Sequence, residues 1–162
     1  MFFRNFVCIF CTNFLIATAF STKAFKNFTP KFFYSQKQLN YGSMYRRYFK
    51  HQLGYTGLVQ DHHCIPKQHR NHILLQTIDY DINKHDNIII MPNNKGKELL
   101  NVKPEYLVHD GGHLKYNIYV KEQLDYIYNN YDDIESYRYQ FWLLQKHLRK
   151  NMKYNEDNIP WK

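Results

Sequence analysis

Two short apolar runs in the middle of the chain each end at a proline. The first is LVQDHHCIP at residues 58–66, and the second lies within DNIIIMPNN at residues 86–94, where positions 88–91 are continuously apolar. Apolar runs that are rich in β-branched residues and stopped by proline, which cannot donate to a strand ladder, are typical of short β-strands. The pattern therefore predicts two strands, with a short helix around residues 72–77 in the connection between them.

The second half of the chain has apolar residues at helical spacing. A first helix is predicted to run to about residue 128, with Leu114, Ile118, Leu124 and Ile127 as its apolar positions. A second amphipathic helix is predicted at residues 134–150, and its inner stripe is Tyr137, Phe141, Leu144 and Leu148. One helical turn is expected within residues 93–107. The last residues, 151–162, have the composition of a tail, and no internal repeat is present.

The first twenty residues combine the parts of a secretory signal peptide. Arg4 precedes an apolar run at about residues 6–15, and Ala17 and Ala19 form an A-x-A arrangement, which predicts cleavage after Ala19 and entry into the secretory pathway. Two alternatives stay open. An uncleaved signal anchor would hold the chain at a membrane, and an organelle-targeting peptide is favoured by the absence of acidic residues before Asp61.

Length and composition set broad limits. A chain of 162 residues is one domain's worth of sequence, divided by pattern into a signal segment (1–19), a basic and aromatic segment (20–56), a core (57–128) and a C-terminal helix with a tail (129–162). The net charge of +8 and the pI near 9.3 favour a polyanionic partner, such as nucleic acid or an anionic membrane surface. An AT-rich genome would also enrich Lys, Asn, Ile and Tyr, so charge only supports this inference.

The cysteines do not form a disulfide framework, because there are three of them. Cys8 and Cys11 lie in the apolar N-terminal run and are interpreted as small apolar residues. Cys64 is interpreted as a buried strand residue beside the two histidines, with the alternative that its thiol is a minor metal ligand.

Four histidines have a spacing that suits a metal site with an added base. His62 and His63 are adjacent on a predicted strand, so their side chains should point to opposite faces. His109 and His113 are four residues apart, which on a helix would bring both imidazoles to one face. Three histidines suffice to hold a catalytic metal ion, and a fourth histidine can then act as a general base. Spacing alone leaves open which member of the doublet has which role.

The motifs as a set resemble a known family. The segments DHHCIP (61–66), HILLQ (72–76), DIN (81–83), DNIIIMP (86–92) and HDGGHLKYN (109–117) are similar, in order and in spacing, to the AHH nucleases of the HNH/endonuclease VII superfamily. The resemblance covers roughly residues 59–127. Asp61 stands where the family has alanine, Ile73 and Leu114 replace prolines, and Ile88 replaces a glycine. None of these departures removes a histidine.

The resemblance implies an α+β fold, the ββα-metal core of HNH-type nucleases, with further helices around it. It assigns His62, His109 and His113 to one divalent cation, Zn²⁺, Mg²⁺ or Mn²⁺, and His63 to general-base catalysis. It also makes Asn87 the support of the loop that carries the base. An acid at Asp61 is expected to orient a neighbouring imidazole or to cap the strand.

The implied reaction is metal-assisted hydrolysis of phosphodiesters in nucleic acid, with DNA expected ahead of RNA. Basic residues near the motifs are candidates for phosphate contacts, although each is also explained as a solvated surface charge: Lys67, Arg70, Lys95, Lys97 and Lys115. An exported, toxin-like nuclease is one biological reading, and an inhibitor or immunity protein is expected if the chain is retained. The alternative is a catalytically inactive, zinc-stabilised module that binds nucleic acid without cutting it.

Overall fold

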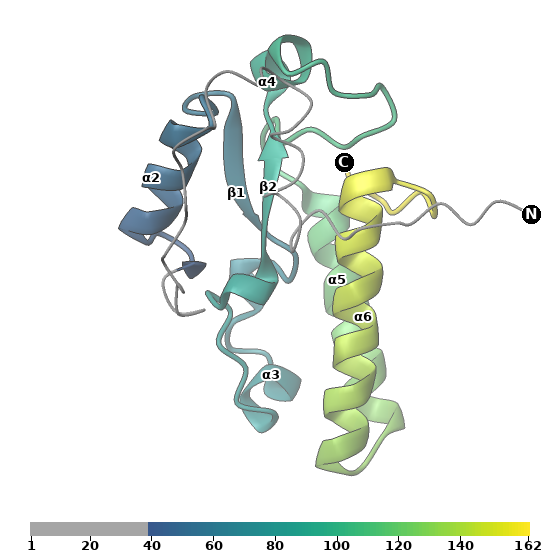
Figure 1. The fold of residues 1–162 in the computed structure, drawn as a ribbon. Coiled ribbons are helices and arrows are strands. Elements are labelled where there is room, and N and C mark those ends of the chain that lie inside the picture. Colours follow the sequence, from purple (N-terminus) through teal and green to yellow (C-terminus); the bar gives the residue numbers. More distant parts are fainter. Residues whose placement is uncertain (1–38) are drawn as a thin grey trace, which may run out of the picture. The chain divides into compact units, whose positions relative to one another are not determined.

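The computed structural model describes residues 39–162 (Figure 1). The predicted signal segment, with Cys8 and Cys11, lies outside the described residues. Within residues 39–162, no helix is both long enough and apolar enough to cross a membrane. In chain order the elements are α2 (Met44–Gln52), β1 (Val59–His63), η3 (Lys67–His69), α3 (Ile73–Thr77), η4 (His85–Asn87), β2 (Ile88–Pro92), α4 (Asn94–Leu99), α5 (Leu114–Asn130) and α6 (Ile134–Tyr154).

The two predicted strands are present and pair antiparallel. Val59 faces Pro92 at one end of the ladder and His63 faces Ile88 at the other, so β1 and β2 match the apolar runs read from the sequence. Pro92 closes β2, as expected of a residue without a backbone N–H. The α+β class is therefore confirmed, with a two-stranded hairpin as its sheet.

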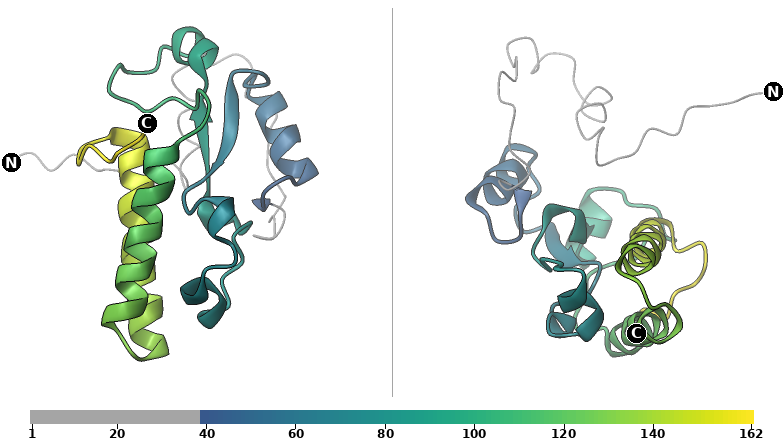
Figure 2. Two further views of the ribbon diagram at one scale, coloured as in Figure 1. Left: turned by 180° about the vertical axis from the view of Figure 1, so that it is seen from behind. Right: turned by 90° about the horizontal axis from the view of Figure 1, so that it is seen from below.

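The two faces of this hairpin have different neighbours. His62 pairs with Ile89, and Ile89 belongs to the hydrophobic core that also contains residues of α5 and α6. Asp61, which points to the opposite face, accepts hydrogen bonds from two residues of α2. Figures 1 and 2 show the hairpin between α2 on one side and the α5/α6 pair on the other. Adjacent residues of β1 therefore enter different environments.

The helix α6 follows the prediction closely. Its N-cap Asp133 accepts hydrogen bonds from the N–H groups of Glu135 and Ser136, which satisfies two donors that a helix start leaves unpaired. The predicted inner stripe is buried in full: Tyr137, Phe141, Leu144 and Leu148. The helix runs to Tyr154, beyond the predicted end at residue 150, and stops at Asn155 in the left-handed conformation.

The buried stripe of α5 differs from the prediction in its first half. Leu124 and Ile127 are buried, but Leu114 and Ile118 are 70% and 50% exposed. Tyr116 and Val120 occupy the inner positions instead, and the hydroxyl of Tyr116 donates to the carbonyl of Cys64. A buried tyrosine is stable where its hydroxyl finds such an acceptor, and apolarity by itself could not predict this contact.

The last twelve residues are not a tail. Asn151 and Met152 are buried within α6, and Ile159 and Trp161 return to the core. The Asn151 side chain bonds both the backbone N–H and the carboxylate of Asp157, at 2.8 and 2.7 Å, and this closes the turn after the helix. The prediction was wrong because it relied on polar composition, whereas the few apolar side chains of this segment are the ones that pack. The short helix α2 also has no counterpart among the predicted helices.

Candidate metal centre and active site

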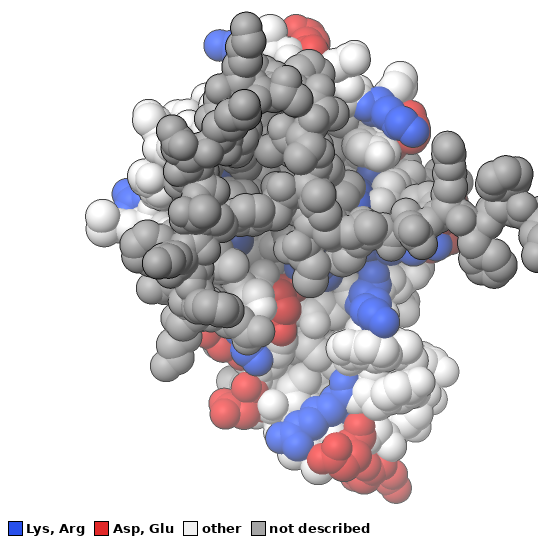
Figure 3. Space-filling view, viewed as in Figure 1, with Lys and Arg blue, Asp and Glu red and all other residues white. Residues whose placement is uncertain are grey.

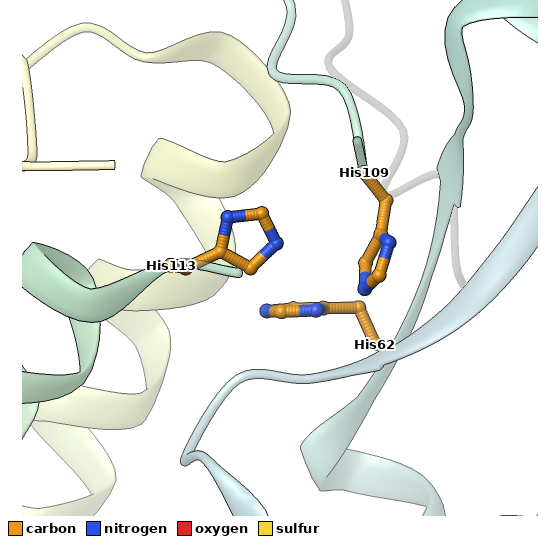
Figure 4. A group of neighbouring side chains, drawn as sticks. All are labelled: His62, His109 and His113. Carbon is orange, nitrogen blue, oxygen red and sulfur yellow. The ribbon is translucent and has the colours of Figure 1, made fainter. Parts of the chain in front are cut away.

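Three imidazoles meet beside the hairpin. One nitrogen of each of His62, His109 and His113 lies within 4.8 Å of the others, and the ring centroids are 5.0 to 5.3 Å apart. Figure 4 shows the three rings turned toward a common point from β1, from the loop before α5 and from the start of α5. Among residues 39–162 the group contains imidazoles and no carboxylate or thiolate.

His109 and His113 do not share a helix, which corrects the expectation from their spacing. The backbone N–H of His109 donates to the carbonyl of Pro92 at 2.8 Å, so His109 is held beside the end of β2. His113 is the N-cap of α5, and the helix begins one residue later. Gly111 between them has φ of +125°, a conformation that glycine adopts readily and that is incompatible with a helix. A glycine loop therefore brings the two rings together.

The chemistry of the triad fits a metal ion. His62 Nε2 and both ring nitrogens of His113 are buried and have no hydrogen-bond partner among the described residues. Burial, and then the proximity of His109 and His113, lowers the pKa of His62 to about 3, and burial together with His109 also lowers the pKa of His113. Both rings are therefore neutral near pH 7 and keep a lone pair to donate. Buried polar atoms normally have a hydrogen-bond partner. These nitrogens have none among the described residues, and a bound metal ion would provide a partner.

His63 lies on the other face of β1, away from the triad's contacts. Its Nε2 is 3.2 Å from the side-chain oxygen of Asn83, and its ring packs at 4.3 Å from the ring of Tyr41. Because an amide oxygen can only accept, Nε2 carries the proton and Nδ1 keeps the lone pair. Burial lowers the pKa of His63 more than the Asn83 bond raises it, so the neutral base form prevails near pH 7.

Asn87 joins the segment that follows His63 to the start of β2. It is fully buried, and its side-chain oxygen accepts from the N–H of Ile65 at 2.7 Å. Its amide nitrogen donates to the carbonyls of Ile65 and Ile82, at 3.1 and 2.8 Å. These bonds tie the segment after His63 to the residues before β2.

Asp61 bonds to α2 and not to an imidazole. Its two carboxylate oxygens each lie 2.9 Å from a cation, one from Arg46 and one from Lys50. Burial opposes ionisation of Asp61, but the bonds and charges of these two cations outweigh it and lower the pKa. Asp61 and His63 share one face of β1, but both carboxylate oxygens of Asp61 bond cations of α2, so the expectation that this acid orients a histidine is wrong.

A comparison with protein families identifies the family of this chain. A family model described as a nuclease family of the HNH/ENDO VII superfamily with conserved AHH matches residues 45–141, well over half of the chain. This chain belongs to the AHH nuclease family. No curated protein and no solved structure gave a match. The matched stretch is wider than the resemblance read from the motifs, and takes in most of α2 and the first part of α6.

The remaining candidate residues of this AHH nuclease are Cys64 and the basic residues near the motifs. Cys64 is fully buried and burial raises the pKa of its thiol to about 11, so the interpretation as a packed residue is confirmed over that of a ligand. Lys67, Arg70, Lys95 and Lys115 are exposed, and Lys97 donates to the carbonyl of Pro104 at 2.8 Å. Where Figure 3 shows described residues, basic side chains are scattered among acidic ones.

Two residues near the site had no assigned role in the sequence. Asn83 lies in the DIN segment that contributed to the family resemblance, and its contact with His63 depends on a turn in which Asp81 accepts from the Asn83 N–H at 2.9 Å. Trp161 packs against the triad from near the end of the chain. A tryptophan in an otherwise polar segment was the available signal, since tryptophan is highly buried on average.

Proposed function

We propose that this AHH nuclease is a metal-dependent endonuclease in which His62, His109 and His113 hold one divalent cation and His63 is the general base. One observation carries the proposal. The two adjacent histidines of β1 have separate surroundings, since His62 joins the three-imidazole group and His63 is held outside it by Asn83. A site built only to bind zinc for stability would have no use for the second imidazole.

The chain's own residues prepare His63 for proton transfer. Asn83 fixes the tautomer, so Nδ1 can take a proton from the water that attacks phosphorus. The lowered pKa keeps that nitrogen unprotonated at neutral pH. Asn87 supports the same region by bonding both backbone groups of Ile65. A cation bound by the triad would supply stabilisation of the negative charge that develops on the phosphoryl and leaving oxygens.

The ligand set favours a transition-metal ion. Imidazole suits zinc and its neighbours, whereas magnesium prefers carboxylate, carbonyl and water oxygens. Among the described residues the group that could hold an ion consists of histidines alone. We therefore place Zn²⁺ ahead of Mn²⁺ and Mg²⁺. Three protein ligands also leave a coordination position for a substrate oxygen.

The proposed substrate is nucleic acid, with DNA ahead of RNA. Exposed basic side chains, including Lys67 in the turn after β1, can contact backbone phosphates without reading sequence. Binding of this kind weakens as the salt concentration rises, because its favourable free energy comes largely from the release of counterions from the nucleic acid. Cleavage should therefore be strongly salt-sensitive and show little sequence preference.

The test compares cutting with metal binding in the purified 162-residue chain. Plasmid DNA and RNA are incubated with Zn²⁺, Mn²⁺ or Mg²⁺, with and without chelator, using wild type, His63→Ala, His62→Ala and the exposed control His51→Ala. We expect His63→Ala to lose about 10²- to 10⁴-fold in rate while it binds metal as tightly as wild type. His62→Ala should lose both properties. Metal binding without cutting by wild type would support the inactive zinc-stabilised module instead.

We also propose that the chain is exported and acts as a toxin-like effector. The support is the signal-like pattern of the first nineteen residues, with a membrane-held anchor and organelle import as the competing routes. N-terminal sequencing of the mature protein separates them, since export predicts a start at Phe20. A chain kept in the producing cell would instead require an inhibitor, which co-purification would reveal.

A further inference from the structure

Trp161 packs directly against the candidate metal centre. Its ring centroid lies 3.9 Å from that of His113, with 32° between the planes, and 5.2 Å from that of His62. It also contacts Tyr116 at 5.3 Å and is 9% exposed. The family match ends at residue 141, so this contact comes from a part of the chain beyond the shared nuclease stretch.

The same segment is fastened to the loop that carries two of the three histidines. The indole Nε1–H of Trp161 donates to the carbonyl of Val108 at 3.1 Å, one residue before His109. The next residue, Lys162, forms an ion pair with Asp110 within the loop. Figure 1 shows the C-terminal end of the chain near the beginning of α5. Trp161 and Lys162 thus hold the loop on both sides of His109.

His113 lacks the support that usually orients a metal-binding histidine. Such a histidine normally donates its second ring nitrogen to a carboxylate, a carbonyl or water, which fixes the ring. Neither ring nitrogen of His113 has a hydrogen-bond partner among residues 39–162. Packing must therefore set the direction of this ring, and among the described residues the indole of Trp161 is nearer to it than the rings of His62 and His109.

We propose that Trp161 is a positioning residue of the metal centre, which stacks on His113 and tethers the 108–113 loop so that the three imidazoles converge. The inference rests on the proposed function insofar as the triad binds a metal ion. It does not require that the protein cuts nucleic acid. Trp161 does not itself bind the ion.

Metal affinity measured by Co²⁺ titration tests the stacking and the tether separately. Loss of a group that supports a metal ligand typically weakens binding about 10- to 100-fold, and we expect this loss for Trp161→Ala. Trp161→Phe keeps an aromatic face but removes the indole N–H, so it should recover the part of the affinity that stacking provides and retain a smaller loss from the missing tether to Val108. Trp142→Ala is the matched control, because Trp142 is the other tryptophan of the chain and lies 46% exposed on α6.

A fluorescence measurement keeps the test valid if Trp161→Ala folds poorly. Since the chain has two tryptophans, Trp142→Phe leaves Trp161 as the sole emitter, and Trp161→Phe leaves Trp142. Co²⁺ quenches indole emission at short range. Co²⁺ should quench the Trp142→Phe protein strongly and the Trp161→Phe protein weakly, and the midpoint of quenching in Trp142→Phe should match its Co²⁺ affinity.

The outcomes distinguish this inference from the proposed nuclease function. Tight Co²⁺ binding by wild type with unchanged affinity in Trp161→Ala, or without quenching of Trp161, would overturn the positioning role and leave the nuclease proposal intact. Weakened binding in Trp161→Ala with rescue by phenylalanine supports the role even if wild type fails to cut. Absence of Co²⁺ binding by wild type would overturn both the metal assignment and this inference.

Discussion

Acidification should destabilise the metal-free protein through His62. In the folded chain the pKa of His62 is lowered to about 3, first by burial and then by its histidine neighbours, whereas an unfolded histidine titrates near about 6.5. Above the unfolded value both states are neutral at this position, and His62 imposes no penalty. Below it the unfolded chain binds a proton that the folded chain does not. The free energy of unfolding therefore decreases as the pH is lowered.

The size of this loss of stability follows from the difference between the folded and the unfolded pKa of His62. Each pH unit between the two pKa values is worth about 1.4 kcal/mol for one proton. At about pH 5, roughly 1.5 units below the unfolded pKa, His62 alone should cost about 2 kcal/mol relative to about pH 7.5. The loss continues until the pH reaches the folded pKa, about 3. His113, whose pKa is also lowered by burial, adds to the loss in the same direction.

Urea unfolding in the presence of chelator measures this difference. We would compare wild type with His62→Gln, which cannot take up the proton, and with His51→Gln, in which an exposed imidazole of α2 is removed. Between about pH 7.5 and about pH 5, His62→Gln should lose about 2 kcal/mol less than wild type. Equal losses in wild type and His62→Gln would refute the conclusion that the fold holds His62 neutral.

Three further substitutions test the supports of the site. Asn87→Ala should cost about 3–6 kcal/mol in urea unfolding, because it leaves three buried backbone groups without partners. Gly96→Ala should cost about 3 kcal/mol or more and lower the melting temperature, because the new Cβ would lie 1.8 Å from a backbone oxygen; Gly112→Ala, where nothing lies within 4 Å, should be tolerated. Asp61→Ala should cost about 3–5 kcal/mol by leaving Arg46 buried without its carboxylate, and a second change, Arg46→Met, should recover part of that loss; additive costs would argue against the pair.

Local patterns were sufficient for several of the regular elements, although not for α2. The proline-bounded runs of β1 and β2 and the inner stripe of α6 were each read correctly, because every one of them depends on periodicity within a single segment. The stripe of α5 was partly misread. There the choice between Tyr116 and Ile118 as the inner residue depends on an acceptor provided by Cys64, more than fifty residues earlier in the chain.

The four histidines of the candidate site were also singled out in the sequence, through motif order and spacing, and the family match agrees with that resemblance. The sequence did not show how the backbone brings these histidines together. Spacing placed His109 and His113 on one helix, whereas Gly111 and the bond from His109 to Pro92 bring them together through a loop. A four-residue separation is compatible with both arrangements, and only the path of the backbone distinguishes them.

The sequence by itself determined the strands, the C-terminal helix, the four histidines and the separation of His62 from His63, since alternation along a strand is a local property of the backbone. The tertiary structure decided what those side chains meet. It turned Asp61 toward α2, set Asn83 against His63 and brought Trp161 onto His113. These contacts join segments separated by fifteen to forty-eight residues, and a linear pattern does not encode which distant surfaces will be buried together.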